Sequence, residues 1–440
     1  MSSTAPIPEY LPGEPPPLAW GPVSIVRELA GKLFFLAAVV ALNLPLWPVY
    51  LVARLRWPRP PNVTPLSRCL RCLRWIVTER PPPPAPSVVA RIALARSVLQ
   101  HMAAAPLRGL AWFLDELLYG RALGDVELRA PLFEISAARS GSTQLARHLE
   151  DDPRICAPNF LQSFLPYLWL WKLAARVPAR LITREEVRRS VLSRFPPAFL
   201  QRHEMDPFCT DTFEMIFLRS HLGHLMMAMG PRSLLEDAAP NHLLPHNRSF
   251  WEEDFTNYLD RVGRKALLFA GGGPNDAPRR LMVKGHFLAV APILARRYPD
   301  ARFLAVLRAP DRRLQSVINF WRCHETEALC GPPPWSWLVQ HALRVEPDYC
   351  ALEMEWFQKE PGPRRCVVRF DDFVQDLPGT LRKVYRECLD LDEPPPQVQK
   401  THAARVRGHY SIDRSLEQLG VDVASLNESL EAYRRWCRGA

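Results

Sequence analysis

Residues 131–150 read PLFEISAARSGSTQLARHLE and predict a short apolar strand, a loop of small residues and then a helix. The loop from Ala137 to Thr143 carries one arginine, one glycine and three hydroxyl side chains. Such a loop turns its backbone N–H groups inward, and the helix adds the positive end of its dipole, so the unit forms a nest for an anion. The loop lacks the lysine of the G-x-x-x-x-G-K-[ST] motif, so we expect it to bind phosphate differently from an ordinary ATPase.

The chain around this unit alternates short β-rich runs with helical patterns, which is typical of βαβ units and predicts an α/β fold with a mostly parallel sheet. The clearest strands are expected at 132–136, 301–307 and 366–370, and the clearest helices at 143–150, 289–297 and 312–321.

The composition is that of a globular, basic protein. The chain has 440 residues, of which 48% are hydrophobic, so general disorder is excluded. Its net charge of +10 favours phosphorylated ligands, polyanions or anionic lipids, although a GC-rich genome would also produce many arginines. Ten cysteines show no framework spacing, and the single C-x-x-C at Cys69 and Cys72 has no second pair, so we expect mostly free, structural thiols.

A run of 20 apolar residues, LFFLAAVVALNLPLWPVYLV, spans 33–52 and matches the roughly 30 Å hydrocarbon core of a bilayer if it is helical. Pro45 and Pro48 would either kink a spanning helix or break it into a re-entrant or interfacial anchor. The alternative is a buried helix of a soluble protein.

The charges that flank this run predict its orientation. Only Arg27 and Lys32 stand close before it, whereas seven arginines follow, at positions 54, 56, 59, 68, 71, 74 and 80. The positive-inside rule therefore predicts a membrane-associated protein with its C-terminal part in the cytoplasm. N-x-[ST] triplets at Asn62, Asn247 and Asn427 leave the Golgi lumen as the alternative.

A second segment, residues 282–320, reads MVKGHFLAVAPILARRYPDARFLAVLRAPDRRLQSVINF. It predicts a strand ending at Lys284-Gly285-His286, a helix, another strand, and then Arg308 ahead of a helix that carries Ser316. An arginine at the carboxyl end of a strand and a serine in the next helix can hold one phosphate together. Because ligands of open parallel sheets bind at those carboxyl ends, this pair and the anion nest are expected to share one crevice.

With both segments in view, the chain resembles the sulfotransferases that use 3′-phosphoadenosine 5′-phosphosulfate (PAPS), in the branch of bacterial and carbohydrate enzymes. ARSGST is similar to the family's 5′-phosphosulfate loop, YPDARFLAVLRAPDRRLQS to its 3′-phosphate motif, and VKGHF to its K-x-H segment. CVVRFDDFVQDLPGTLRKVYREC and HYSIDRSLEQLG are similar to the tail of the same branch. The resemblance covers about residues 128–420.

The resemblance implies a P-loop-like three-layer sandwich, preceded here by the hydrophobic helical anchor. It implies transfer of a sulfuryl group from PAPS, without a metal ion, to a hydroxyl or amine of a carbohydrate, lipid or small-molecule acceptor. We expect no nucleic-acid partner. The predicted organisation is a disordered N-terminus at 1–29, the anchor at 30–57, a basic, proline-rich linker at 58–87, a helical lead-in at 88–127 and the sulfotransferase domain at 128–440.

The resemblance also assigns site residues. His286 is the expected general base, with Arg139 stabilising the leaving phosphate and Lys284 bridging to the sulfuryl group unless it is only a solvated strand end. The cofactor-binding residues are expected to be Arg139, Ser140, Gly141, Ser142, Thr143, Arg308 and Ser316.

Three points depart from this pattern or leave it open. The phosphate loop has Arg139 where the cytosolic branch has lysine, so its role is expected to be electrostatic. The segment that covers the nucleotide in that branch is not evident, and Arg405, Arg407 and Gly408 are its only candidate substitutes. Some branches use a carboxylate base, so Glu214 rivals His286 unless it faces solvent on a helix.

Two other functions remain open at this point. A P-loop kinase or NTPase would need a loop lysine, which is missing, and a Walker-B-like aspartate, for which Asp371 and Asp372 are the only candidates. The second is a non-catalytic protein that binds a membrane surface. Such a protein would not need Arg139, His286, Arg308 and Ser316, so the presence of all four argues against it.

Overall fold

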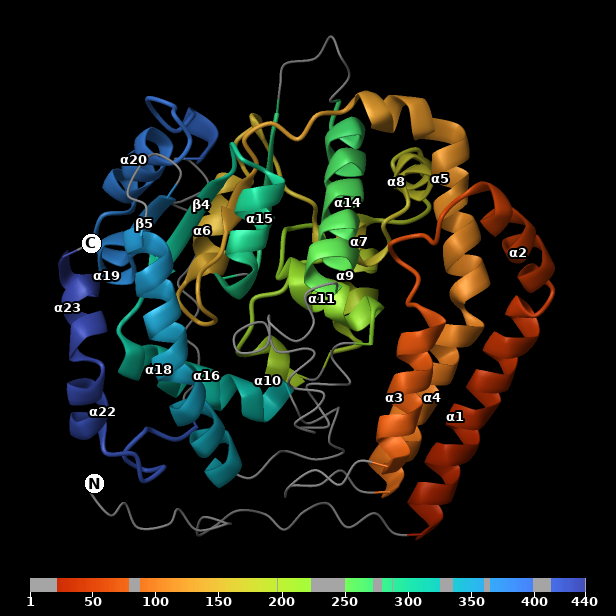
Figure 1. The fold of residues 1–440 in the computed structure, drawn as a ribbon, viewed down its shortest axis with the longest axis horizontal. Coiled ribbons are helices and arrows are strands. Elements are labelled where there is room, and N and C mark those ends of the chain that lie inside the picture. The colour runs from red at the N-terminus through yellow and green to blue at the C-terminus, as the bar shows by residue number, and fades with distance from the viewer. Residues whose placement is uncertain are drawn as a thin grey trace.

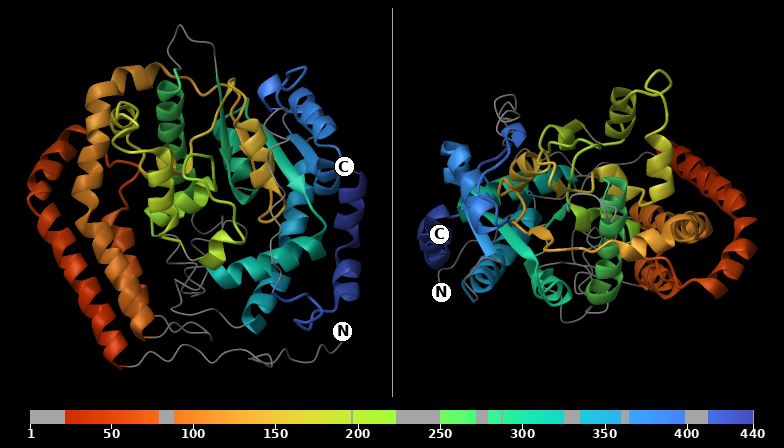
Figure 2. Two further views of the ribbon diagram at one scale, coloured as in Figure 1. Left: turned by 180° about the vertical axis from the view of Figure 1, so that it is seen from behind. Right: turned by 90° about the horizontal axis from the view of Figure 1, so that it is seen from above.

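The computed structural model describes the chain in nine segments, residues 22–78, 88–195, 197–222, 250–271, 279–286, 288–324, 335–359, 365–398 and 413–439. An α/β part that contains a single sheet lies at one end of the molecule, and a layer of N-terminal helices lies at the other (Figure 1, Figure 2).

Five strands form a parallel sheet in the order β2-β3-β1-β4-β5. Their bounds are β1 (Leu132–Glu134), β2 (Ile155–Cys156), β3 (Arg280–Lys284), β4 (Arg302–Leu307) and β5 (Arg365–Arg369). The central strands β1, β3 and β4 are almost fully buried, as expected for a parallel sheet that is covered on both faces. The predicted parallel α/β fold is therefore confirmed.

Helices cover both faces of the sheet, so the domain is a three-layer sandwich. Leu132 and Met282 point to one face and pack against α6, α19 and α20. Phe133 and Val283 point to the other face and pack against α11, α14, α15 and α18. The bounds of these helices are α6 (Ser142–Leu149), α19 (Phe370–Gln375), α20 (Leu377–Glu387), α11 (Phe213–Ser220), α14 (Thr256–Phe269), α15 (Ala291–Arg297) and α18 (Trp335–Lys359).

The remaining helices connect or flank these layers. They are α7 (Phe160–Phe164), α8 (Leu168–Ala174), α9 (Arg184–Leu192), α10 (Pro197–Leu200), α16 (Pro310–His324), α22 (Val423–Ser429), α23 (Glu431–Gly439) and the single turns η1 (Phe250–Phe255) and η2 (Leu288–Val290).

Five N-terminal helices precede the sheet, namely α1 (Pro22–Asn43), α2 (Leu46–Arg56), α3 (Leu66–Thr78), α4 (Val88–Ala103) and α5 (Ala105–Asp125). The lead-in helix predicted from residue 88 is interrupted at Ala104, just before Pro106 at the start of α5. Tyr50 of α2 packs with Trp112 and Phe113 of α5, and Tyr167, just before α8, belongs to the same cluster, which ties this layer to the rest of the molecule.

The structure does not support the predicted hydrophobic helical anchor as a single membrane-spanning helix, and the apolar run over 33–52 is broken at the prolines. The helix stops at Asn43, and α2 starts after Pro45 in a new direction, so that Leu33–Asn43 and Leu46–Arg56 are bent by 56°. Pro45 and Pro48 have no N–H to continue the helical hydrogen bonds, and this accounts for the break. Among the described residues no single helix is long and apolar enough to span a membrane, although this bent pair meets the length and composition criteria together.

Candidate active site

The loop after β1 has the conformation that an anion nest requires. Arg139 and Gly141 both have positive φ angles, 67° and 97°, and Gly141 caps the N-terminus of α6. A Cβ atom on Gly141 would lie 2.7 Å from the Phe370 ring, so only glycine fits there. The hydroxyl of Ser140 is buried without a hydrogen-bond partner in the described structure. A buried donor of this kind is costly unless a ligand satisfies it.

The two halves predicted from separate segments meet in space. Arg139 Nε donates a hydrogen bond to Ser316 Oγ at 3.0 Å, and Arg308 Nη1 donates to the Arg139 carbonyl at 2.7 Å. The two guanidinium groups also lie over the rings of Phe320 and Phe370 respectively. The loop, the end of β4 and helix α16 therefore meet in one cationic site at the carboxyl end of the sheet, where we expect the predicted crevice.

Buried polar contacts hold α16, and with it Ser316, in place. Arg313, which is 1% exposed, donates to Glu346 at 2.7 Å and to Glu353 at 3.1 Å, both on α18. Asn319 binds the backbone of the segment that starts at Asp413. Arg405, Arg407 and Gly408, the candidates for a nucleotide-covering segment, lie outside the described residues.

His286 follows β3 and lies between the loop and α11. Its Nδ1 is 2.8 Å from the carbonyl oxygen of Ser136. Because a carbonyl can only accept, Nδ1 carries the proton and the Nε2 lone pair is left available. The backbone N–H of His286 donates to Glu214 Oε1 at 2.8 Å. Glu214 is 1% exposed, so the alternative that it faces solvent is wrong.

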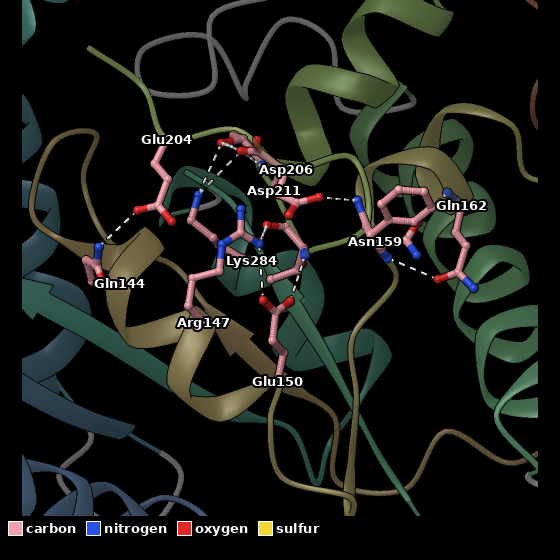
Figure 3. Close-up of polar contacts among 12 residues, drawn as sticks. Gln144, Arg147, Glu150, Asn159, Gln162, Glu204, Asp206, Asp211 and Lys284 are labelled. Carbon is pink, nitrogen blue, oxygen red and sulfur yellow. Dashed lines mark hydrogen bonds and ion pairs between the residues drawn. The ribbon is translucent and has the colours of Figure 1, made fainter. Parts of the chain in front are cut away.

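Lys284 is also buried, at 1% exposed, so it is not a solvated strand end. Its Nζ donates to Thr212 Oγ1 at 3.2 Å and lies 4.0 Å from Asp211, which pairs with His203. Figure 3 shows how the segment around Asp211 is tied to α6, the helix that follows the phosphate loop. Arg147 of α6 donates to the carbonyl of Thr210, and Glu150 accepts the N–H of Thr210 at 2.7 Å.

Burial and the Lys284 cation shape the electrostatics of this centre. Burial raises the pKa of Glu214 and of Glu134 to about 7, and Lys284 opposes both shifts. Burial and Lys284 together lower the pKa of His286 to about 3, so its ring is neutral at physiological pH. Burial alone would raise the pKa of Asp211, but its partner His203 and Lys284 bring it below the ordinary value.

The electrostatics of the crevice fit an anionic ligand. Burial and the neighbouring Arg139 cation lower the pKa of Arg308, so two like charges are held close together in a partly desolvated site. An anion with several oxygens would relieve this repulsion and satisfy the buried Ser140 hydroxyl. Among the residues that the structure describes, no group of three or more His, Cys, Asp or Glu side chains is arranged to hold a metal ion.

Several residues at this centre were not predicted from the sequence, among them Glu134, Ser136, Asp211 and Thr212. Glu134 left a signal, because it is the one charged side chain in the apolar run Leu132–Ile135. The other three are ordinary polar residues in loops, and only the folded chain brings them to Lys284 and His286.

Comparisons with known proteins agree with this geometry. The model of the sulfotransferase family matches residues 131–393. The sulfotransferase STF9 from Mycobacterium avium has a similar structure, with a TM-score of 0.58 and 15% identity over 88% of this chain and 95% of that one. The sulfotransferase STF1 from Mycobacterium tuberculosis H37Rv is also similar, with a TM-score of 0.52 and 20% identity over 83% of this chain and 92% of that one. No curated protein matches the sequence.

Proposed function

The chain belongs to the sulfotransferase family and is an enzyme of sulfuryl transfer, and we propose that its donor is PAPS and its acceptor a hydroxyl or amine of a lipid, glycan or small molecule. The observation that carries the proposal is the meeting of Arg139 with Ser316 and of Arg308 with the Arg139 carbonyl, which unites the two motifs in one anion site.

We assign the donor site to the residues that line the crevice. Arg308 and Ser316 hold the 3′-phosphate, and the N–H groups and hydroxyls of the loop hold the 5′-phosphosulfate, the loop residues being Ser140, Gly141, Ser142 and Thr143. Arg139 lies between the two halves, where its charge stabilises the negative charge that develops on the leaving phosphate. PAPS, when bound, supplies the sulfuryl group.

We assign the general base to His286. Its Nδ1 proton is engaged by Ser136, so Nε2 is the atom that takes the proton of the acceptor hydroxyl or amine. Lys284, held by Thr212 and close to Asp211, provides a fixed positive charge for the sulfuryl oxygens. Glu214, whose Oε1 holds the His286 backbone, is the rival base because its second oxygen, Oε2, is buried without a partner in the described structure.

The decisive experiment is transfer of ³⁵S from labelled PAPS to an extract of lipids and glycans from the host. We expect labelled products that are absent with the His286→Ala variant. If turnover in that variant equals the wild-type value, the base is Glu214 and not His286. Calorimetry is the companion test, and a preference for ATP over adenosine 3′,5′-bisphosphate, or a requirement for Mg²⁺, would refute the PAPS site.

We also propose that the N-terminal helices associate with a membrane, through a re-entrant or interfacial segment and not a straight span. Of the 28 large hydrophobic side chains that the described residues expose, 20 lie between Leu33 and Leu118. The described residues up to 125 carry 12 lysines and arginines against four acids. Apolar side chains beside such an excess of cations suit an anionic lipid surface.

The arginines that follow the apolar run 33–52 favour a location of the catalytic part on the cytoplasmic side of the membrane, with the Golgi lumen as the alternative. Asn62 gives no support to the lumen, because this sequon asparagine is 2% exposed and its amide donates to Tyr167. Flotation with vesicles of anionic or of neutral lipid tests membrane association. We expect recovery with the anionic vesicles, whereas a protein that stays at the bottom with both would overturn this part of the proposal.

A further inference from the structure

One serine connects three segments that carry the site. Ser136 lies between β1 and the phosphate loop, and its carbonyl accepts the Nδ1 proton of His286 at 2.8 Å. Its hydroxyl oxygen accepts the backbone N–H of Val306 in β4, two residues before Arg308, at 2.7 Å. Ser136 therefore contacts both the strand that ends at Arg308 and His286, and it directly precedes the phosphate loop.

Glu134 determines how Ser136 is oriented. Glu134 Oε1 accepts both the backbone N–H and the hydroxyl of Ser136. The main chain is held on the other side as well, since the Glu134 carbonyl accepts the N–H of Gly285, next to His286. These bonds fix the peptide that follows Ser136 so that its carbonyl points at the imidazole.

Glu134 is an unusual residue for its place. It is 0% exposed in the central strand of the sheet, and its Oε2 has no hydrogen-bond partner in the described structure. Burying a carboxyl group is costly, and an apolar residue would suit a parallel strand better on stability grounds alone. The sulfuryl-transfer roles assigned above make no use of it.

We propose that Glu134 and Ser136 are positioning residues that hold His286 in its Nδ1–H tautomer with Nε2 turned to the acceptor. The inference rests on the proposed function, in which His286 is the base. Neither residue touches the reacting atoms, and both act through the bond from Nδ1 to the Ser136 carbonyl.

Several charged groups lie close enough to influence Glu134 and His286. Lys284, the register partner of Glu134 in β3, and Glu353 of α18 influence the carboxyl of Glu134. Lys284, His203 and Asp211 influence His286, whose backbone is held by Glu214 of α11. None of these groups competes with the Ser136 carbonyl for the Nδ1 proton in the described structure, so the orientation of Ser136 decides the tautomer.

The test is the ¹⁵N spectrum of the His286 ring together with steady-state kinetics of the full chain. In the wild type we expect a protonated Nδ1 and an unprotonated Nε2. Glu134→Leu should mix the two tautomers and lower kcat by about tenfold to a hundredfold, while KM for PAPS stays within about twofold. Glu134→Gln, whose amide oxygen still accepts from Ser136, should restore the wild-type tautomer and most of kcat.

Further variants separate positioning from mere stability. Ser136→Gly removes the hydroxyl but keeps the backbone, and it should also mix the tautomers. It is the variant to use if Glu134→Leu does not fold. Asp115→Asn disturbs a buried ion pair with Lys265 that joins α5 to α14, and it should lower stability without changing the His286 spectrum.

A wild-type spectrum with the proton on Nε2, or an unchanged tautomer in both Glu134→Leu and Ser136→Gly, would overturn the inference even if sulfuryl transfer is confirmed. The opposite combination of results can also be distinguished. A tautomer that shifts as expected in a protein that transfers no sulfate would uphold the hydrogen-bond connection and refute the assignment of His286 as base.

Discussion

The two ends of the molecule differ in which side chains they bury: the site end buries charged groups, whereas the N-terminal layer leaves apolar groups exposed. The site end buries Glu134, Glu214 and Lys284 around one histidine and exposes few large hydrophobic side chains. The N-terminal layer exposes bulky residues such as Phe34, which is 77% exposed, and carries a strong excess of cations. Buried charges are expensive and persist where chemistry uses them, whereas exposed apolar side chains persist where a partner covers them.

The largest effect is expected from His286→Ala, which removes the proposed general base at the site end. The value of kcat should fall by roughly 10²–10⁴-fold, because proton transfer from the acceptor loses its catalyst. The affinity for adenosine 3′,5′-bisphosphate should not change, since His286 is assigned no contact with either phosphate. Rate assays with labelled PAPS and calorimetry with the bisphosphate measure the two quantities, and equal losses in both would contradict the assignment.

The next effect concerns the cationic crevice. Arg308→Ala should raise the dissociation constant of adenosine 3′,5′-bisphosphate by about tenfold to a hundredfold, the value of a charged hydrogen bond, and Ser316→Ala by less. Arg312→Ala is the matched control, because this neighbouring arginine is 72% exposed. If all three variants bind alike, the 3′-phosphate is held elsewhere.

A third prediction addresses the other end. Phe34→Asp should weaken partition into anionic vesicles by about tenfold or more, because a buried phenyl group is worth about 1.5–3 kcal/mol. Activity on a water-soluble acceptor should stay the same, since α1 is remote from the site in Figure 1. Val374→Asp, a partly exposed position on α19, is the control in flotation. Equal partition of wild type and both variants would show that the exposed apolar layer does not contact lipid.

The smallest effect is one of pH on stability. The pKa of Glu214 is raised to about 7 in the folded chain, so its protonated form stabilises the fold fully below pH about 4.5, and this contribution is lost as the pH rises through 7. We therefore compare the melting temperature of Glu214→Gln with that of the wild type at each pH. The difference, variant minus wild type, should rise by on the order of 5 °C from pH 5 to pH 8.

Thermal melts without ligand measure this difference. Glu428→Gln, which changes an exposed carboxyl, should follow the wild type at every pH. A Glu214→Gln curve that runs parallel to the wild-type curve would mean that Glu214 is ionised throughout this range.

Much of the site was predictable because its parts are local. The strand, loop and helix around Arg139 follow from small residues and Gly141 beside an apolar run, and the position of Arg308 follows from the end of a strand. The break in the apolar run could be predicted from Pro45 and Pro48, but the 56° angle between the two helices is known only from the structure.

The sequence by itself determined the βαβ alternation, the strand–loop–helix unit around Arg139 and the order of the two motifs that we assign to phosphate binding, because each depends on neighbours within a few residues. Only the tertiary structure decided that Arg139 meets Ser316, 177 positions away, and that Ser136 and Glu214 hold His286. Parallel strands bring distant segments to one edge of a sheet, and burial there sets the pKa values. Both effects depend on three-dimensional neighbours, which no local pattern records.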